Sequence, residues 1–350
     1  MREKQLSVTL YSIRDQELER LFLLGSIEVL PFEDLHECVV NDIFVVPKPH
    51  SAKFRPIIDQ RYANSFTRKV LFKMESIKDV KDILQPGDLR IKLDFKDAFL
   101  HLFYRRTYCK FGAFWWRNQL WTFRSMMFGR THTPRGWTKV MKLVVTHLRR
   151  LGILCIIYID DLICFLGSNM DRARETTELI IRILIDLGIT INFEKSVTLP
   201  SKRLDFLGFI IDSRNMKIFA EAEKMKRMKD TARGLLRKKF VTVRKLAKFL
   251  GMVTALAHAV LPWRLQSRAT LAFKNNIFKA LIKWDAPVTL TEESKLELRT
   301  WITAFRNGTA GRSTTENRTG SRFRTAAQQV SEAFQEPRIL SQLRLGKKTI

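Results

Sequence analysis

The spacing of hydrophobic and polar residues predicts three amphipathic helices before residue 190. They cover residues 15–30, 134–151 and 168–187, and in each one apolar residues recur three or four positions apart. That spacing places the apolar residues on one face of a helix. Pro134 suits the first turn of the second helix, and Ser168 is the predicted N-cap of the third.

Short apolar runs predict strands around these helices. Residues 42–59 give two extended pieces joined by a basic turn, and residues 89–103 begin as a strand that continues into an aromatic segment. The runs Ile153–Ile159 and Leu162–Phe165 flank the dipeptide Asp160-Asp161. Two apolar runs joined by such a short polar dipeptide predict a β-hairpin.

The order of elements from residue 89 to residue 211 is strand, helix, hairpin, helix and strand, with further short strands expected at Ile189–Asn192 and Leu204–Ile211. This order predicts an α+β layer of the split βαβ kind, with helices on one face of an antiparallel sheet. Residues 221–305 change to helices rich in Lys and Arg. Residues 306–350 are polar and weakly periodic, which predicts little order.

The formal net charge of +27 over 350 residues indicates a polyanionic partner. Nucleic acid is the first interpretation, because each phosphate that Lys or Arg neutralises releases counterions. A membrane surface is the second, and a basic chain without a dedicated partner is the third. The charge is too large to favour the third.

The four cysteines, Cys38, Cys109, Cys155 and Cys164, are scattered without CxxC spacing. They predict neither a zinc site nor a disulfide framework, and they fit a reducing compartment. The N-terminal residues lack a signal-peptide pattern. The longest apolar run, Ile153–Ile159, is far shorter than the ~20 residues of a membrane span. We therefore expect an intracellular protein, cytoplasmic or nuclear, that does not enter a membrane.

Two acidic sites occur where apolar runs end. Asp94 and Asp97 follow the strand that begins at residue 89, and Asp160-Asp161 forms the turn of the predicted hairpin. Carboxylates brought together at strand ends can hold two Mg²⁺ ions about 3.5–4 Å apart, which suits the transfer of a nucleotide to a 3′-hydroxyl. The alternative is structural, because Asp is common in turns. The flanking strands and the basic composition favour the metal-site hypothesis.

Four motifs together resemble those of reverse transcriptases, in family order over residues ~15–305. Tyr158-Ile159-Asp160-Asp161 is similar to the Tyr-x-Asp-Asp box, Leu93–Phe99 to the first catalytic motif, Phe54–Asp59 to the fingers segment, and Phe206-Leu207-Gly208 to the primer grip. The phrases Phe72–Glu75, Thr133–Arg135 and Asp205–Ser213 further resemble the DIRS-type group, retroelements that carry a tyrosine recombinase.

The resemblance implies an RNA-directed DNA polymerase of a retrotransposon, with a right-hand fold of fingers, ferredoxin-like palm and helical thumb. The implied regions are an N-terminal helix and fingers (1–88), a palm (89–215, with a fingers part at 104–133), a thumb and start of the connection (216–305), and a poorly ordered tail (306–350). The implied partners are an RNA template, a DNA primer and deoxynucleoside triphosphates. The implied cofactor is a pair of Mg²⁺ ions, with Mn²⁺ as an alternative. The oligomeric state is not predicted.

The resemblance also assigns roles to residues. Asp94 and Asp160 would ligate both metals, with Asp161 less critical. The implied catalytic set is Asp94, Asp160 and Asp161, the metal-binding set adds Phe95, and the primer grip is Phe206, Leu207 and Gly208. The implied nucleotide-binding set is Lys48, Arg55, Phe95, Asp97, Ala98, Phe99, Phe128, Gly129 and Lys195.

Within the nucleotide-binding set, Lys48 and Arg55 would grip the triphosphate, and Phe99 would exclude a 2′-hydroxyl. Lys195 would protonate the leaving pyrophosphate, while Asp97 and Ala98 would contribute backbone groups. Four of these residues have an ordinary alternative. Lys48 and Arg55 could belong to a solvated basic hairpin, Phe99 to the core, and Lys195 to the surface.

The basic helices have two interpretations. Residues 221–250 hold eleven Lys or Arg against three Asp or Glu, with apolar residues at helical spacing. They would be a thumb that follows the phosphate backbone of a duplex, or only the solvated face of a helical bundle. Aromatic stacking on single strands is one interpretation of four tryptophans, but core positions are favoured for Trp115, Trp116, Trp121 and Trp137.

The sequence departs from the family pattern near residue 128. Met126-Met127 stands where Leu-Pro is usual, Arg130 where an apolar residue is usual, and Thr133 where Ala is usual. No carboxylate set for RNase H follows residue 305. These departures leave an alternative open, a catalytically inactive nucleic-acid-binding protein derived from a reverse transcriptase.

Overall fold

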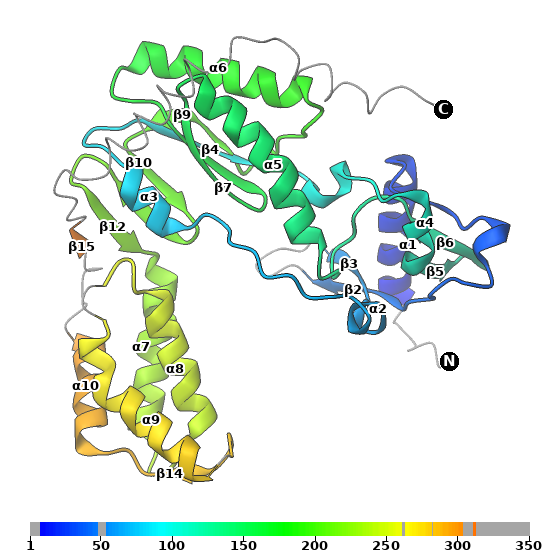
Figure 1. Ribbon diagram of the computed structural model, residues 1–350. Coiled ribbons are helices and arrows are strands. Elements are labelled where there is room, and N and C mark those ends of the chain that lie inside the picture. Colours follow the sequence, from blue (N-terminus) through cyan, green and yellow to red (C-terminus); the bar gives the residue numbers. More distant parts are fainter. Residues whose placement is uncertain (1–7, 48–53, 261–262, 282, 304–310, 313–350) are drawn as a thin grey trace.

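A computed structural model describes residues 8–47, 54–260, 263–281, 283–303 and 311–312 (Figure 1). The tail predicted at 306–350 lies outside these residues, apart from the two-residue strand β15 (Gly311–Arg312). Among the described residues, none of the helices has the length and apolar character needed to cross a membrane.

The central sheet has four antiparallel strands in the order β7-β8-β4-β9. The strands are β4 (Arg90–Asp94), β7 (Leu154–Tyr158), β8 (Asp161–Phe165) and β9 (Val197–Ser201). Helix α5 (Thr133–Arg150) connects β4 to β7 by way of other elements, and α6 (Met170–Asp186) connects β8 to β9. This is the predicted split βαβ arrangement.

The two long helices of this layer match their predictions closely. Helix α5 has Pro134 in its first turn and ends before Gly152, whose φ is +79°. Helix α6 has Asn169 as its N-cap in place of the predicted Ser168, because the Asn169 side chain accepts a hydrogen bond from the backbone N–H of Arg172. The strand expected at Ile189–Asn192 is only an isolated bridge between Ile191 and Phe95.

The sheet is buried on both faces, since alternate residues of each strand point to opposite sides. One face packs with α5 and α6 through Ile91, Leu93, Cys155, Ile157, Leu162 and Cys164. The other face contributes Ile156, Ile163 and Phe165 to a core that it shares with α3 (Ile77–Ile83) and a second sheet.

The second sheet has the order β10-β11-β12-β15. Its strands include β10 (Arg203–Phe206), β11 (Phe209–Asp212) and β12 (Lys217–Ala220). The single strand predicted at Leu204–Ile211 is therefore wrong. The chain reverses at Leu207-Gly208, which have φ of +50° and +76°, and Phe206 pairs with Phe209. Positive φ at both central residues is the geometry of a two-residue hairpin turn.

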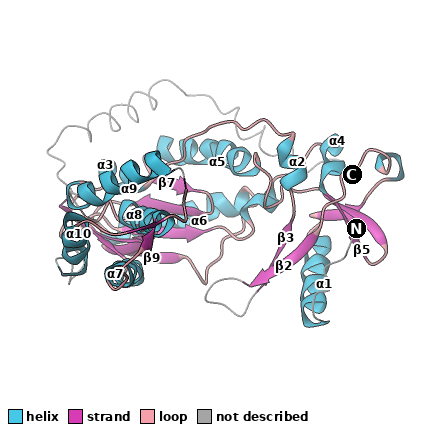
Figure 2. Cartoon of the chain, turned by 90° about the horizontal axis from the view of Figure 1, so that it is seen from below, coloured by secondary structure: helices cyan, strands magenta, loops and turns pink. Residues whose placement is uncertain are grey.

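The N-terminal part of the chain forms a separate layer (Figure 2). The helix predicted at 15–30 begins earlier and ends earlier, as α1 (Val8–Leu23), and β1 (Ile27–Val29) follows it. Strand β1 joins β5 (Ala113–Trp116) and β6 (Gln119–Phe123) in the order β1-β6-β5. The remaining elements are the hairpin β2 (Ile43–Pro47) and β3 (Phe54–Ile58), the helices α2 (Arg61–Ser65) and α4 (Arg106–Cys109), and the 3₁₀ helices at Phe32–Asp34, Ala98–His101 and Lys110–Gly112.

Helices form the opposite end of the molecule (Figures 1 and 2). They are α7 (Ala222–Leu236), α8 (Val243–Ala255), α9 (Arg268–Leu281) and α10 (Glu292–Thr303), with a 3₁₀ helix at Leu265–Ser267 and the short pair β13 (Val241–Thr242) and β14 (Pro287–Val288). The predicted excess of Lys and Arg is present in all of these α-helices except the last, residues 292–303, which has three Glu against one Lys and one Arg. Their apolar faces meet in one core that includes Met228, Leu246 and Phe249.

Three of the four tryptophans assigned to the core are buried, namely Trp116, Trp121 and Trp137. The assignment is wrong for Trp115, which is 57% exposed. Trp115 alternates with its neighbour Trp116 along β5, so the two side chains lie on opposite faces of the sheet.

Candidate active site

The two predicted acidic sites meet at one end of the central sheet. Asp94, the last residue of β4, is the cross-strand partner of Asp161, the first residue of β8. One residue further, the backbone N–H of Phe95 donates to the carbonyl oxygen of Asp160 at 2.8 Å. The sheet register therefore brings Asp94, Asp160 and Asp161 together although 66 residues separate the first two along the chain.

The turn that carries the aspartates has a strained backbone. Ile159 has φ of +53°, a conformation that is unusual for any residue with a branched β-carbon. The indole N–H of the buried Trp137, on α5, donates to the Ile159 carbonyl oxygen at 2.6 Å. Strain of this kind persists when the surrounding structure holds it, and it is common at functional sites.

Asp94 is held by the segment that precedes β9. The side-chain amide of Asn192 donates to Asp94 Oδ1 at 2.9 Å, and the Asp94 backbone N–H donates to Ser196 Oγ at 3.0 Å. The Asn192 backbone N–H also donates to the Asp94 carbonyl oxygen at 2.8 Å. These contacts fix both the backbone and the carboxylate of Asp94.

The carboxyl groups of the turn lie in an environment that disfavours their charge. Asp160 is exposed at the tip of the turn, yet the surrounding protein partly desolvates its carboxyl and raises the pKa, and nearby Asp94 raises it further. Burial raises the pKa of Asp161 to about 6, with Asp160 as the second cause. Lys195 opposes the shift of the Asp160 pKa, and Lys92 opposes that of Asp161. The predicted residue Lys195 is therefore close enough to Asp160 to affect its charge.

The residues at this turn fit a magnesium site completed by substrate. Among the described residues, no three His, Cys, Asp or Glu side chains are grouped so that protein alone could enclose a metal ion. Mg²⁺, however, is usually held by one or two carboxylates together with water and substrate phosphates. Asp94 and Asp160 carry such hard oxygen atoms, and burial and the neighbouring Asp94 raise the pKa of Asp160.

Two predicted nucleotide-site aromatics are in contact. The rings of Phe99 and Phe128 lie 4.9 Å apart between centroids, with Phe99 buried and Phe128 half exposed. The adjacent Gly129 has φ of +96°, and its carbonyl oxygen accepts a hydrogen bond from the Asn64 side chain at 2.7 Å. Asn64 also accepts from the backbone N–H of Thr131 at 2.9 Å, so helix α2 holds this loop in place.

Comparison with known proteins agrees with the geometry. Residues 46–211 match the family described as reverse transcriptase (RNA-dependent DNA polymerase). This matched segment contains β4, the Asp160-Asp161 turn and the Phe99–Phe128 contact. The chain carries a reverse transcriptase domain.

Relatives of this domain occur in viruses and transposons. Protein P of duck hepatitis B virus (strain China) is 30% identical over 149 residues, covering 41% of this chain and 18% of that protein. The retrovirus-related Pol polyprotein from transposon gypsy of Drosophila melanogaster is 23% identical over 176 residues, covering 50% of this chain and 16% of that protein. The chain thus spans less than a fifth of the length of these curated relatives.

Solved structures confirm the predicted right-hand polymerase fold. The foamy viral protease-reverse transcriptase dRH in complex with double-stranded DNA superposes with a TM-score of 0.71 at 18% identity, over 89% of this chain and 50% of that chain. The foamy viral enzyme in complex with an RNA/DNA hybrid gives 0.66 at 17% identity, over 89% and 38%.

The predicted primer-grip residues of the reverse transcriptase domain form the β10–β11 turn. Phe206 is buried, and the amino group of Lys224, on α7, donates to the Gly208 carbonyl oxygen at 3.1 Å. Asp205, next to Phe206, forms a 2.6 Å ion pair with Lys92 of β4. Lys92 precedes Asp94 by two residues, so this pair connects the hairpin to the strand that carries the first aspartate.

The structure describes some of the other predicted residues of the domain fully and others only in part. Ala98 is buried in the 3₁₀ helix after Asp97, and the Asp97 carboxylate pairs with Arg20 of α1 at 2.7 Å. Phe95 is buried, with its backbone at the aspartate turn. Arg55 pairs with Val46 in the β2–β3 hairpin, but its side chain and all of Lys48 lie outside the described residues. Their contact with a triphosphate stays a prediction.

Sequence reasoning missed the residues that hold the site. Asn192, Ser196 and Trp137 all contact the aspartate-bearing backbone, and none of them was assigned that role. A signal in the sequence existed only for Asn192, which lies three residues before the predicted Lys195.

Proposed function

We propose that this chain is an RNA-directed DNA polymerase that adds deoxynucleotides to a primer 3′ end, from a retrotransposon of the DIRS type. The observation that carries the proposal is the register of Asp94 opposite Asp161, with Asp160 in the same turn. The DIRS assignment rests on the phrases Phe72–Glu75, Thr133–Arg135 and Asp205–Ser213. The gypsy relative is consistent with a transposon origin.

In the proposed mechanism, Asp94 and Asp160 would hold two Mg²⁺ ions, and Asp161 and the backbone of Phe95 would contribute to the same site. When bound, the ions would activate the primer 3′-hydroxyl and stabilise the leaving pyrophosphate. The carboxylates contribute negative charge in a fixed geometry, which Asn192 and Ser196 maintain for Asp94. Little covalent chemistry is asked of the protein in phosphoryl transfer.

The remaining predicted residues bind the nucleotide or handle its proton. Lys195, near enough to Asp160 to lower its pKa, would donate a proton to the pyrophosphate oxygen. Phe99, supported by Phe128, would close the space that a 2′-hydroxyl needs. Lys48 and Arg55 would bind the triphosphate oxygens, and Arg in particular offers a two-pronged hydrogen-bond donor.

The regions of the chain would then divide as in a right hand. Residues 1–88 and 104–133 would be the fingers, the rest of 89–215 the palm, and 216–305 the thumb and start of the connection. An RNA template and a DNA primer would lie against the exposed basic residues of α7, through contacts with phosphates. Two solved structures that share the fold contain double-stranded DNA and an RNA/DNA hybrid, respectively.

A primer-extension assay tests the proposal. We expect the chain to extend a DNA primer on an RNA template with deoxynucleotides and Mg²⁺, and EDTA to stop the reaction. Asp160→Asn should reduce the rate by about 1,000-fold or more, since metal ligation is worth several kcal/mol of transition-state stabilisation. Asp171→Asn, at an exposed carboxylate of α6, is the matched control and should keep full activity.

A second candidate function is nucleic-acid binding without turnover. It is favoured by Arg130, which is buried beside the nucleotide loop and whose Nε atom has no hydrogen-bond partner within the described part of the chain. A folded chain that binds primer–template but extends no primer, with either Mg²⁺ or Mn²⁺, would support this candidate and contradict the polymerase proposal.

A further inference from the structure

Glu75 directly precedes the N-cap of helix α3, which packs beside strand β7. The next residue, Ser76, is the N-cap of α3 and forms a capping box with Asp79, whose carboxylate accepts from the Ser76 backbone N–H at 2.8 Å. Ile77 and Val80 of α3 are buried in the core. The cap and the packing fix the backbone at Glu75, so its side chain reaches the sheet from a rigid support.

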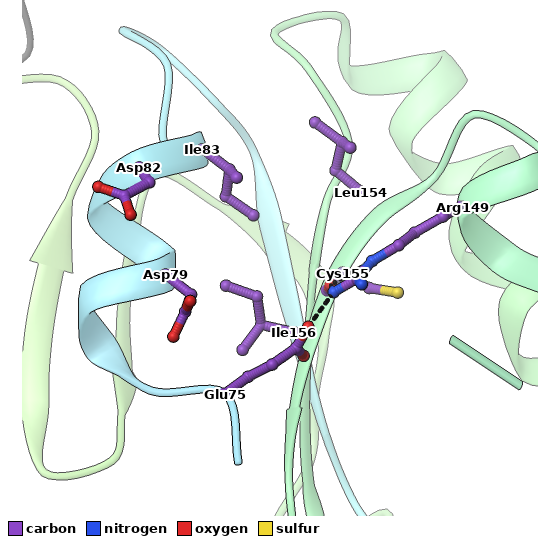
Figure 3. Close-up of a pocket in the computed structure, with 8 residues that line it drawn as sticks. All are labelled: Glu75, Asp79, Asp82, Ile83, Arg149, Leu154, Cys155 and Ile156. Atoms are coloured by element: carbon purple, nitrogen blue, oxygen red, sulfur yellow. Dashed lines mark hydrogen bonds and ion pairs between the residues drawn. The ribbon is translucent and has the colours of Figure 1, made fainter. Parts of the chain in front are cut away.

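The Glu75 side chain binds the free edge of the central sheet (Figure 3). Among the strands that the structure describes, β7 is the outermost of the central sheet, so one row of its backbone groups has no partner strand there. Glu75 Oε2 accepts a hydrogen bond from the backbone N–H of Ile157 at 2.9 Å. A side chain therefore satisfies a group that an added strand would otherwise pair with.

Arg149, in the last turn of α5, completes the contact. Its guanidinium forms an ion pair with Glu75 and donates to the Cys155 carbonyl oxygen, from Nη2 at 2.6 Å and from Nε at 3.2 Å. In Figure 3 the two side chains meet beside β7, at the border of a pocket of about 70 Å³ that Asp79 and Asp82 also line. Hydrogen bonds between charged groups are stronger than neutral ones.

The contact lies directly before the aspartate turn. Ile157, which Glu75 holds, precedes Asp160 by three residues, and Trp137 holds the Ile159 carbonyl oxygen from α5. The strained backbone at Ile159 thus has two supports, one from Trp137 at Ile159 itself and one from Glu75 two residues earlier. A free edge strand can shift or fray, and such a shift at Ile157 would be passed on to Asp160 through only two intervening residues.

We propose that Glu75 and Arg149 form a clasp on the edge of β7 that positions the turn bearing Asp160 and Asp161. The proposal rests on the proposed polymerase function and deepens it, since it gives a role to the phrase Phe72–Glu75. Glu75 is a positioning residue here, because its side chain contacts backbone and Arg149 rather than the carboxylates. Protection of an open sheet edge, without any effect on the turn, is the alternative.

Hydrogen exchange and single-turnover extension test the clasp together. In Glu75→Ala, we expect the backbone amides of Ile157 and of residues 159–161 to exchange hydrogen at least about 10-fold faster. Without the Glu75 side chain, these amides can exchange through local opening of the β7 edge instead of through unfolding of a larger part of the chain. The maximal rate of nucleotide addition should fall about 10- to 100-fold, because small misplacements of a reacting group are costly. The Kd for primer–template and the KM for the nucleotide should change less than about 3-fold, since the binding surfaces are untouched.

Two further variants sharpen the test. Glu75→Gln keeps an acceptor for the Ile157 N–H and should recover most of the rate, whereas Arg149→Gln should resemble Glu75→Ala. Glu292→Ala, which removes the carboxylate of the exposed ion pair with Lys295 on α10, is the matched control and should change neither readout. If Glu75→Ala does not fold, Glu75→Gln and Arg149→Gln carry the test.

Two results would overturn the clasp. One is unchanged exchange at Ile157 in both Glu75→Ala and Arg149→Gln. The other is faster exchange at Ile157 alone, with residues 159–161 and the rate unaffected, which would reduce the contact to edge protection. If the unmodified chain extends no primer, the proposed function is refuted. In that case, hydrogen exchange at residues 159–161 alone still tests whether the clasp holds the turn.

Discussion

Asp160 and Asp161 carry charge where their surroundings disfavour it. Desolvation raises the pKa of each, and each is close to another aspartate. The proposed metal site needs negative charge that is not already neutralised. The ionised carboxylates therefore lower the free energy of unfolding. Residues selected for function often lower the stability of the folded state in this way.

Asp161→Asn should therefore stabilise the chain at neutral pH. An ordinary Asp ionises near pH 3.8, whereas the pKa of Asp161 in the fold is about 6. The folded state is destabilised by this group as pH rises from about 4 to 6, and the cost is constant above that range. We expect the variant to gain about 1–2 kcal/mol in the free energy of unfolding at pH 7, after allowance for partial solvent exposure. Near pH 4 the gain should vanish.

Urea denaturation at both pH values, in metal-free buffer, measures this difference. Asp171→Asn is a suitable control, because that carboxylate is 89% exposed on α6. An equal gain at pH 4 and pH 7 would show that the effect of Asp161→Asn does not arise from its charge.

Phe99 is the residue that we propose excludes a 2′-hydroxyl. Its ring is 6% exposed and packs on Phe128, which gives a rigid wall. Phe99→Val should lower the preference for deoxynucleotides over ribonucleotides by about 10- to 100-fold, the scale of a steric change in an apolar pocket. The measurement compares kcat/KM for matched nucleotide pairs. The same change at the exposed Phe103 should leave the ratio intact, and an unchanged ratio in Phe99→Val would remove its role as a gate.

At the scale of elements, the aspartate turn depends on α5. Trp137→Phe removes the hydrogen bond to Ile159 while keeping an aromatic ring in the core. We expect a loss of about 1–2 kcal/mol in the free energy of unfolding, typical of an unpaired polar group, and a decrease of about 10-fold in kcat.

Trp301→Phe provides a matched control in the helical region. The Trp301 indole donates to the Gln266 carbonyl oxygen at 2.9 Å and to Ser267 Oγ at 3.0 Å, far from the aspartates along the chain. It should lose similar stability and keep its kcat. Equal decreases in kcat for both variants would mean that the turn has no special dependence on Trp137.

The elements differ in how well the sequence predicts them, and the reason is physical. Helix α5 was predicted within about one residue, because its apolar period is strong and Pro134 and Gly152 mark its ends. The β10–β11 hairpin was missed, since Leu204–Ile211 is mostly apolar and the turn has a non-glycine residue, Leu207, at positive φ. The turn is established by the cross-strand pairing of Phe206 with Phe209, which only the structure shows.

The residues of the candidate site also differ in how well the sequence predicts them. Asp94, Asp160 and Asp161 were predicted because each lies in a local motif at the end of an apolar run. The supports of those residues come from distant segments, such as Arg149 with Glu75 and Asn192 with Asp94. Contacts of this kind depend on the tertiary arrangement, so a local pattern in a single sequence does not predict them.

At the scale of the whole molecule, the salt dependence of nucleic-acid binding tests the proposed role of the basic helix α7. Lys226 and Arg227 are exposed on α7, whereas Arg233 on the same helix pairs with Asp230 at 2.7 Å. If α7 follows a phosphate backbone, replacing Lys226 and Arg227 with Gln should reduce the slope of log K against log salt concentration by about 1–2, since each lost phosphate contact contributes about 0.9. Arg233→Gln should change the slope less, because its charge is already partly neutralised.

Fluorescence anisotropy of a labelled duplex from about 50 to 200 mM salt gives these slopes. Equal slopes for all variants and the unmodified chain would mean that the charge of α7 is only a solvated face.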